Sequence, residues 1–219
     1  MENKFVSQRL GESYTVYQHP SGLTIMLCPM PGFSTAYAAM TTQYGSVDLE
    51  FETEQGVERS PAGVAHFLEH KLFESPQGDA MELFAQTGAN CNAYTSFDKT
   101  CYYFSCTDQF QKNLEFLLDF VTHPYFTEQT VEKEQGIIAQ EIVMYEDDPE
   151  WRVYVNLFQG MYHCHPIRTE IAGTVSSIQE ITHQTLYDCY HTFYNLHNMV
   201  LTVSGNFQPQ QVLETVDRL

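Results

Sequence analysis

The sequence has few basic side chains, no paired cysteine motif and no long apolar run. Ten Lys and Arg against 28 Asp and Glu give a formal net charge of −18. Such a charge repels phosphates and argues against nucleic acid or an anionic membrane surface as a partner. The six cysteines include no Cys-x-x-Cys pair, and no apolar stretch approaches membrane-spanning length. Because the opening residues MENKFVSQRL are not followed by the apolar region of a secretory signal, we expect a cytoplasmic protein with reduced thiols.

The order of strand-like and helix-like segments predicts an α+β fold. Hydrophobic residues make up 43% of the 219 residues, which is enough for a well-packed core. β-Branched and aromatic runs come first, with a hairpin turn at residues 20–22 and a strand pair within residues 90–108. From residue 109 helical patterns dominate, and NMVLTVSGN is one further strand. These blocks indicate a mainly antiparallel sheet covered by helices, in a single domain over residues 1–219.

Three finer expectations concern the boundaries of elements. Ser60-Pro61 is typical of a helix start, with serine as the N-cap and proline at the first helical position. The acidic residues 48–58 are predicted to form a loop that leads into this helix. Residues 176–194 are predicted to form one helix.

The pentapeptide His66-Phe67-Leu68-Glu69-His70 is the strongest functional signal in the sequence. On a helix, His66 and His70 stand one turn apart on the same face, with Glu69 beside the second histidine. Two imidazoles at this spacing can hold one metal ion, and the carboxylate can move a proton there. The order H-x-x-E-H is the reverse of the H-E-x-x-H motif of zinc peptidases. The competing interpretation is a pair of core histidines with satisfied hydrogen bonds.

A catalytic zinc ion needs a third protein ligand, and the predicted helix over residues 127–147 carries five glutamates. Glu134 and Glu141 lie seven residues apart, which is two helical turns, so they share a face. A glutamate that faces inward on a packed helix is costly unless it is paired or bound to a metal. Both residues are therefore candidates for the site.

Several segments, in the same order along the chain, resemble the pitrilysin/insulinase family of inverzincin zinc metallopeptidases. They are SPAGVAHFLEHKLFES, GANCNAYTSFDKTCYYFS and HNMVLTVSGNF, and the E-x6-E spacing on the later helix is similar as well. The likeness is closest to small bacterial cytosolic members. It covers nearly the whole chain but only the first, zinc-carrying half of a two-half clamshell subunit. The second half, which in the family contributes an arginine and a tyrosine near the substrate carbonyl, has no counterpart here.

The resemblance implies a role for each matching residue. The implied ligands of one Zn²⁺ per chain are His66, His70 and Glu141. Glu134 would support the site from behind, and Glu69 would be the catalytic general base. Asn92 and Ala93 would lie on an edge strand that binds extended peptide by pairing main chain to main chain.

The sequence therefore predicts a zinc-dependent endopeptidase domain that hydrolyses bonds in peptides or unfolded segments. Its expected partners are a peptide substrate and a second half-domain, homodimer mate or sister subunit, with no nucleic acid and no membrane. One alternative is a non-catalytic peptide-binding or partner subunit of the same fold, inactive without a second half. Another is a zinc site that serves stability alone, although structural sites usually have four protein ligands.

Overall fold

The computed structural model describes residues 2–53, 56–76 and 78–218. Its strands are β1 (Glu2–Ser7), β2 (Glu12–Gln18), β3 (Thr24–Pro29), β4 (Ala36–Thr42), β5 (Glu50–Thr53), β6 (Gly56–Arg59), β7 (Glu74–Ser75), β8 (Gly78–Asp79), β9 (Asn90–Thr95), β10 (Thr100–Cys106) and β11 (Met199–Gly205). Its helices are α1 (Val64–Leu72), α2 (Ala80–Thr87), α3 (Phe110–Thr122), α4 (Glu128–Glu146), α5 (Pro149–Met161), α6 (Val175–Ile178), α7 (His183–Phe193) and α8 (Pro209–Val216), with short 3-10 turns η1 (Pro166–Arg168) and η2 (Leu196–Asn198).

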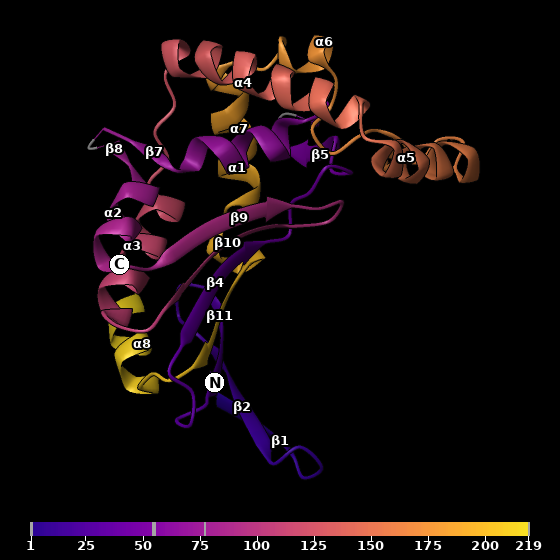
Figure 1. Cartoon of the computed structure of the whole chain (residues 1–219). Coiled ribbons are helices and arrows are strands. Elements are labelled where there is room, and N and C mark those ends of the chain that lie inside the picture. The colour runs from indigo at the N-terminus through magenta and orange to yellow at the C-terminus, as the bar shows by residue number, and fades with distance from the viewer. Residues whose placement is uncertain (1, 54–55, 77, 219) are drawn as a thin grey trace.

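Seven strands form one curved sheet in the order β1-β2-β3-β11-β4-β10-β9 (Figure 1). Only the β3–β11 pair is parallel among the neighbours in this sheet, and the other five pairs are antiparallel. The predicted α+β class with a mainly antiparallel sheet is therefore confirmed. β9 is an edge strand, so one side of its main chain is free of sheet partners in the described chain.

The core lies between one face of the sheet and the helices that cover it. Along β11, Leu201 and Val203 are buried while their neighbours are half-buried, as the two-residue period of a strand requires. Tyr102 and Phe104 of β10 are fully buried on the same pattern. The helices α2, α3 and α8 gather along one side of the sheet, and α1, α4 and α7 cluster beyond its β9 end, while α5 projects away from the body (Figure 1).

The predicted start of the helix that carries both histidines is wrong, because α1 begins at Val64 and Gly63 is its N-cap. Gly63 has φ 96°, a conformation that glycine adopts without strain. The carbonyl oxygen of Ala172 would lie 2.5 Å from a Cβ atom at this position. Gly173, with φ 76°, approaches the carbonyl of Ala62 in the same way. This close packing of two distant segments, rather than a local cap, determines where the helix begins.

Two further boundaries differ from expectation. The acidic stretch is a hairpin of β5 and β6, not a loop, and residues 54–55 of the stretch lie outside the described residues. The expected helix over residues 176–194 is divided into α6 and α7. The hydroxyl of Thr182 accepts a hydrogen bond from the N–H of Thr185 and so caps a new helix. In the described ranges, no helix has the length and apolar character needed to cross a membrane.

Candidate active site

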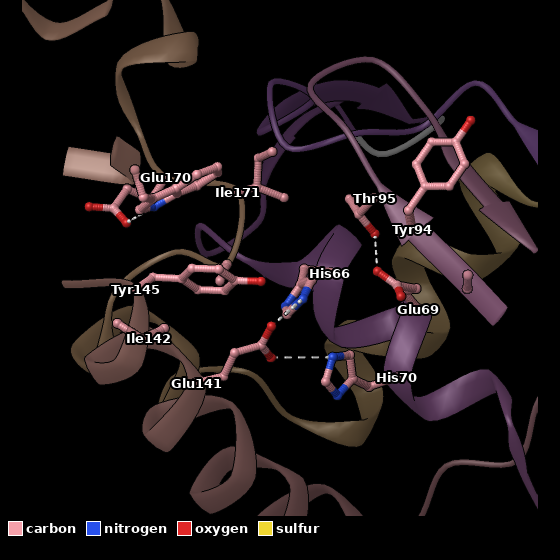
Figure 2. Close-up of a pocket in the computed structure, with 13 residues that line it drawn as sticks. His66, Glu69, His70, Tyr94, Thr95, Glu141, Ile142, Tyr145, Glu170 and Ile171 are labelled. Atoms are coloured by element: carbon pink, nitrogen blue, oxygen red, sulfur yellow. Dashed lines mark hydrogen bonds and ion pairs between the residues drawn. The ribbon is translucent and has the colours of Figure 1, made fainter. Parts of the chain in front are cut away.

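Two helices bring the candidate metal ligands together. His66 and His70 lie one turn apart on α1, and Glu141 reaches toward both from α4 (Figure 2). The Glu141 carboxylate oxygens lie 3.7 Å from Nε2 of His66 and 3.5 Å from Nε2 of His70. One ligand atom from each of the three residues lies within 4.8 Å of the others. The sequence separates Glu141 from the histidines widely, so only the packing of α4 against α1 makes this group.

The donor set fits a zinc ion. Neutral imidazole nitrogens and carboxylate oxygens are ordinary zinc ligands, and metal–nitrogen bonds of about 2.0–2.1 Å place the ligand atoms of a tetrahedral site about 3.3 Å apart. The distances from Glu141 to the histidines are near this value but too long for strong hydrogen bonds. Three protein ligands leave one coordination position open, which is the pattern of catalytic rather than structural zinc sites.

The pKa values of the two histidines are shifted in opposite directions. Burial, reinforced by the neighbouring His70, lowers the pKa of His66 to about 3, so its imidazole is neutral and can donate a lone pair. Burial also lowers the pKa of His70, but the hydrogen bond with Glu134 and the charges of Glu69 and Glu141 outweigh it, and the pKa is raised overall. The site thus holds one imidazole neutral and surrounds the other with carboxylates.

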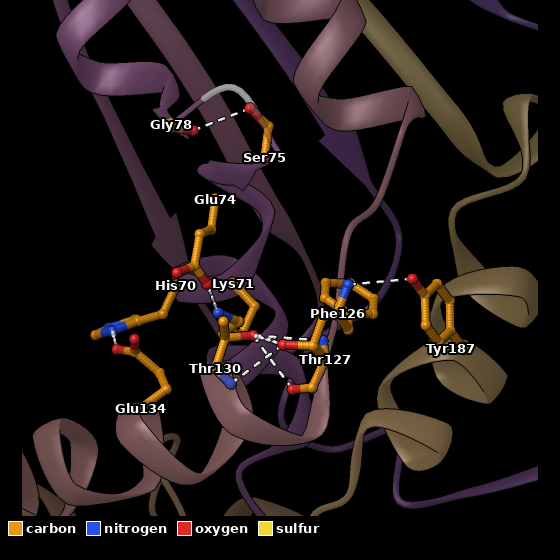
Figure 3. A network of polar contacts seen from close by, with 10 residues as sticks. All are labelled: His70, Lys71, Glu74, Ser75, Gly78, Phe126, Thr127, Thr130, Glu134 and Tyr187. Carbon is orange, nitrogen blue, oxygen red and sulfur yellow. Dashed lines mark hydrogen bonds and ion pairs between the residues drawn. The ribbon is translucent and has the colours of Figure 1, made fainter.

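A layer of polar contacts supports His70 from behind (Figure 3). Its Nδ1–H donates to Oε1 of Glu134 at 2.9 Å, which leaves Nε2 directed at Glu141. The adjacent Lys71 is 1% exposed, forms an ion pair with Glu74, and is also attracted by the charge of Glu134. The structure therefore places Glu134 against the imidazole of His70, on the side away from Glu141.

Glu69 lies beside the three candidate ligands, and its carboxylate is directed at the sheet. Its Oε2 accepts a hydrogen bond of 2.8 Å from the hydroxyl of Thr95, at the end of β9. Burial raises the pKa of Glu69, whereas the hydrogen bond from Thr95 and the nearby His70 lower it and the charge of Glu141 raises it. The carboxylate is thus separate from the three-residue group yet close enough to His70 and Glu141 to share their electrostatic field.

A cavity of about 370 Å³ opens above the group. It is lined by His66, Glu69, His70, Ala93, Tyr94, Thr95, Glu141, Ile142, Tyr145, Trp151, Glu170, Ile171 and Ala172. The free edge of β9 forms one wall, and the segment around Ile171 forms the opposite wall (Figure 2). Trp151 Nε1 and Arg152 each donate a hydrogen bond to the carboxylate of Glu170, which holds the start of α5 against that segment.

The sequence prediction and the cavity agree in part. His66, Glu69, His70 and Glu141 are brought together, and Ala93 lines the cavity. Asn92 is not among the lining residues, and its Oδ1 accepts a hydrogen bond from the N–H of Ala93.

Thr95, at the end of the predicted peptide-binding strand, also lines the cavity, whereas sequence reasoning named no role for Tyr145, Trp151 and Glu170. Tyr145 follows Glu141 by one helical turn, a spacing that could have indicated it. Trp151 and Glu170 carry no local signal, because tertiary packing places them.

Comparison with known proteins identifies the class of this fold and site. A family model described as insulinase (peptidase family M16) matches residues 39–175, and one described as the peptidase M16 inactive domain matches residues 180–219. The chain therefore belongs to the insulinase family of peptidases, M16, as its motifs predict.

Individual relatives agree with this assignment. The uncharacterized zinc protease YmfH of Bacillus subtilis (strain 168) is 47% identical over 211 residues, which are 95% of this chain and 49% of YmfH. An M16-like peptidase from Alicyclobacillus acidocaldarius has a TM-score of 0.93 and 46% identity, over 97% of this chain and 50% of that chain. Pitrilysin, at 18% identity and a TM-score of 0.81, shares the fold over 98% of this chain and 23% of its own. The chain spans about half the length of the curated relatives it matches.

Proposed function

We propose that this chain is the metal-carrying half of a zinc-dependent endopeptidase. The observation that carries the proposal is the grouping of His66, His70 and Glu141 on two helices, with the separate carboxylate of Glu69 in the same cavity. In this proposal the first three residues hold one Zn²⁺, and Glu134 orients His70. The name of zinc protease carried by the relatives supports the choice of metal.

The proposed chemistry divides between metal and base. A bound zinc ion would supply a Lewis acid that acidifies water and polarises the scissile carbonyl. Glu69 accepts the proton of the attacking water and delivers it to the leaving amine, a role that suits a carboxylate beside the ligands but not among them. Burial raises the pKa of Glu69, which brings it toward the range useful for moving protons in both directions.

The free edge of β9 is the proposed binding surface for the peptide. In the hairpin that joins β9 to β10, the N–H of Ser96 donates to the carbonyl of Lys99. Because the direction of main-chain groups alternates along an antiparallel strand, the N–H groups of Thr95 and Ala93 point away from β10. An extended peptide can pair with these groups as an added strand. This places the peptide along the wall of the cavity that contains Glu69.

A second half is the proposed partner. The chain covers about half the length of its relatives, so a complete peptidase would need a second half-domain, a homodimer mate or a sister subunit. The alternative function is that of a non-catalytic subunit. Without a second half, this chain would bind peptide or a partner but would not cleave peptide bonds. The two functions differ in turnover but not in metal binding.

Metal content and peptide cleavage, measured together on three variants, test the proposal. Glu141→Gln should lower the zinc content, while Glu69→Gln should keep one zinc per chain and lose cleavage of a fluorescence-quenched peptide library by about 10²–10⁴-fold. Glu132→Gln, on the same helix but exposed, is the matched control and should change neither property. The assays should use both the 219-residue chain and a longer polypeptide that includes a second half.

The outcomes separate the proposals. Equal zinc content in wild type and Glu141→Gln would remove Glu141 from the ligand set. Full activity of Glu69→Gln would remove the general base. Zinc and peptide binding without cleavage, both with and without a second half, would favour the non-catalytic alternative.

A further inference from the structure

Thr95 is the residue that holds the carboxylate of Glu69. Its hydroxyl lies 2.8 Å from Oε2 of Glu69, the usual distance of an O–H···O hydrogen bond. The main-chain N–H of Thr95 acts in the same direction, since it lowers the pKa of this carboxylate. One residue therefore stabilises the charged form of Glu69 through its hydroxyl and its main chain.

The surrounding hydroxyls determine the direction of this hydrogen bond. The hydroxyl of Thr100, on β10 opposite Thr95, donates to the carbonyl oxygen of Tyr44 at 2.9 Å. Its contact with Thr95 Oγ1 is longer, at 3.5 Å, and its single proton is already committed to Tyr44. The hydroxyl of Thr95 is then free to direct its own proton to Glu69, the only ionisable acceptor among these contacts. The hydroxyl of Thr95 is therefore the donor and the carboxylate of Glu69 is the acceptor.

The main chain of Thr95 connects Glu69 to the free edge of the sheet. Its N–H points away from β10, in line with the outward N–H of Ala93. A peptide that pairs with β9 would therefore lie along the main-chain edge that ends at Thr95, the residue whose hydroxyl contacts Glu69. The position of the carboxylate and the position of the peptide are set by one strand.

We propose that Thr95 is the positioning residue of Glu69, fixing its carboxylate relative to the histidines of α1 and to a peptide bound along β9. This inference rests on the proposed peptidase function, because it assigns Glu69 a part in the reaction. Loss of the hydroxyl would leave the carboxylate with additional rotamers, and a misplacement of about 1 Å in a reacting group can cost on the order of 10²-fold in rate. The edge of β9 itself would remain, since the main chain is unchanged.

Kinetics of two substitutions test this role. Thr95→Val keeps the branched shape and removes the hydroxyl, and it should lower kcat by about 10- to 100-fold while KM changes less than about 3-fold. Thr95→Ser restores a hydroxyl and should recover kcat to within a few-fold of wild type. Zinc content should equal that of wild type in both variants. Thr202→Val, on β11, is the matched control for a threonine-to-valine change in the same sheet and should leave kcat and KM unchanged.

Crystal structures of wild type, Thr95→Val and Thr95→Ser provide a readout that needs no activity. The Glu69 carboxylate should keep its place in wild type and Thr95→Ser and should move or spread over several rotamers in Thr95→Val. An unmoved carboxylate in Thr95→Val, an unchanged kcat, or an effect on KM alone would overturn the proposal. If wild type cleaves no peptide, the proposed function fails, and the three structures still decide whether Thr95 holds Glu69.

Discussion

At the residue scale, Glu134 is the hydrogen-bond partner of a candidate metal ligand and is not itself in the candidate ligand group. Its carboxylate accepts the Nδ1–H of His70 at 2.9 Å, which leaves Nε2 of that ring as the lone-pair donor. The partner of a ligating histidine holds the ring in its orientation and increases its basicity. The buried charge of Lys71 nearby offsets part of the negative charge that Glu134 brings to α4.

Replacing Glu134 should therefore weaken the metal site without removing a ligand. Glu134→Gln keeps an oxygen acceptor but loses the charge, and the dissociation constant for zinc should rise by about 10-fold. Competition with a chromophoric chelator would measure this constant. The exposed Glu132→Gln on the same helix is the control and should bind zinc like wild type. A loss as large as that in Glu141→Gln would mean that Glu134 is itself a ligand.

At the scale of elements, β9 combines two tasks. One side of its main chain pairs with β10, and the other side forms the open wall of the cavity. In the free chain the side chain of Asn92 covers the outward N–H of Ala93 through its Oδ1 at 2.8 Å. An exposed strand edge invites association with other chains, and a side chain that covers its donors reduces this risk.

Proline substitutions along β9 should distinguish its two sides. Ala93→Pro removes an outward N–H, so KM for a peptide should rise by about 5- to 10-fold, the loss of one main-chain hydrogen bond, while zinc content stays unchanged. Asn92→Pro removes an N–H that points toward β10 and should instead lower the free energy of unfolding by about 1–3 kcal/mol, because a carbonyl of β10 loses its donor. Steady-state kinetics and urea unfolding measure the two effects. An unchanged KM in Ala93→Pro would contradict pairing of peptide with β9.

Elements were predictable where their signals are local. The helix α2 runs between Asp79, whose side chain caps the first turn, and Gly88, which ends the helix at φ 72°, and both residues are readable in the sequence. The start of α1 was not predictable from the local sequence. The helix begins after Gly63 because the main chain there packs against Ala172, which lies more than a hundred residues later in the chain. Helix propensity describes the conformation that a segment prefers in isolation, and contacts between distant segments can override this preference.

For the molecule as a whole, net charge is the property that acts over the longest distance. A net charge of −18 surrounds a cavity whose own walls include Glu69, Glu141 and Glu170. This field attracts cationic peptides and repels anionic ones, and salt weakens both effects, because the screening length falls from about 10 Å at 0.1 M to about 3 Å at 1 M.

Salt should therefore change substrate preference in a predictable direction. Raising NaCl from 0.05 to 0.5 M should increase KM severalfold for a peptide rich in Lys and Arg and should lower or leave unchanged KM for its Glu-rich counterpart. The kcat values should change little, since the proposed metal ligands and Glu69 are partly or fully shielded from solvent. Steady-state kinetics with the peptide pair measures the effect, and an equal response of both peptides would contradict it.

By itself, the sequence determined the class of the protein and the set of residues available for chemistry. The H-x-x-E-H spacing and the seven-residue spacing of Glu134 and Glu141 express the helical period directly, so a reader of the chain can place these side chains on common faces. Only the tertiary structure decided which faces meet. The packing of α4 on α1 placed Glu141 and Glu134 against different histidine nitrogens, and the end of β9 placed Thr95 against Glu69. Contacts between residues far apart in the chain depend on packing, which no local pattern encodes.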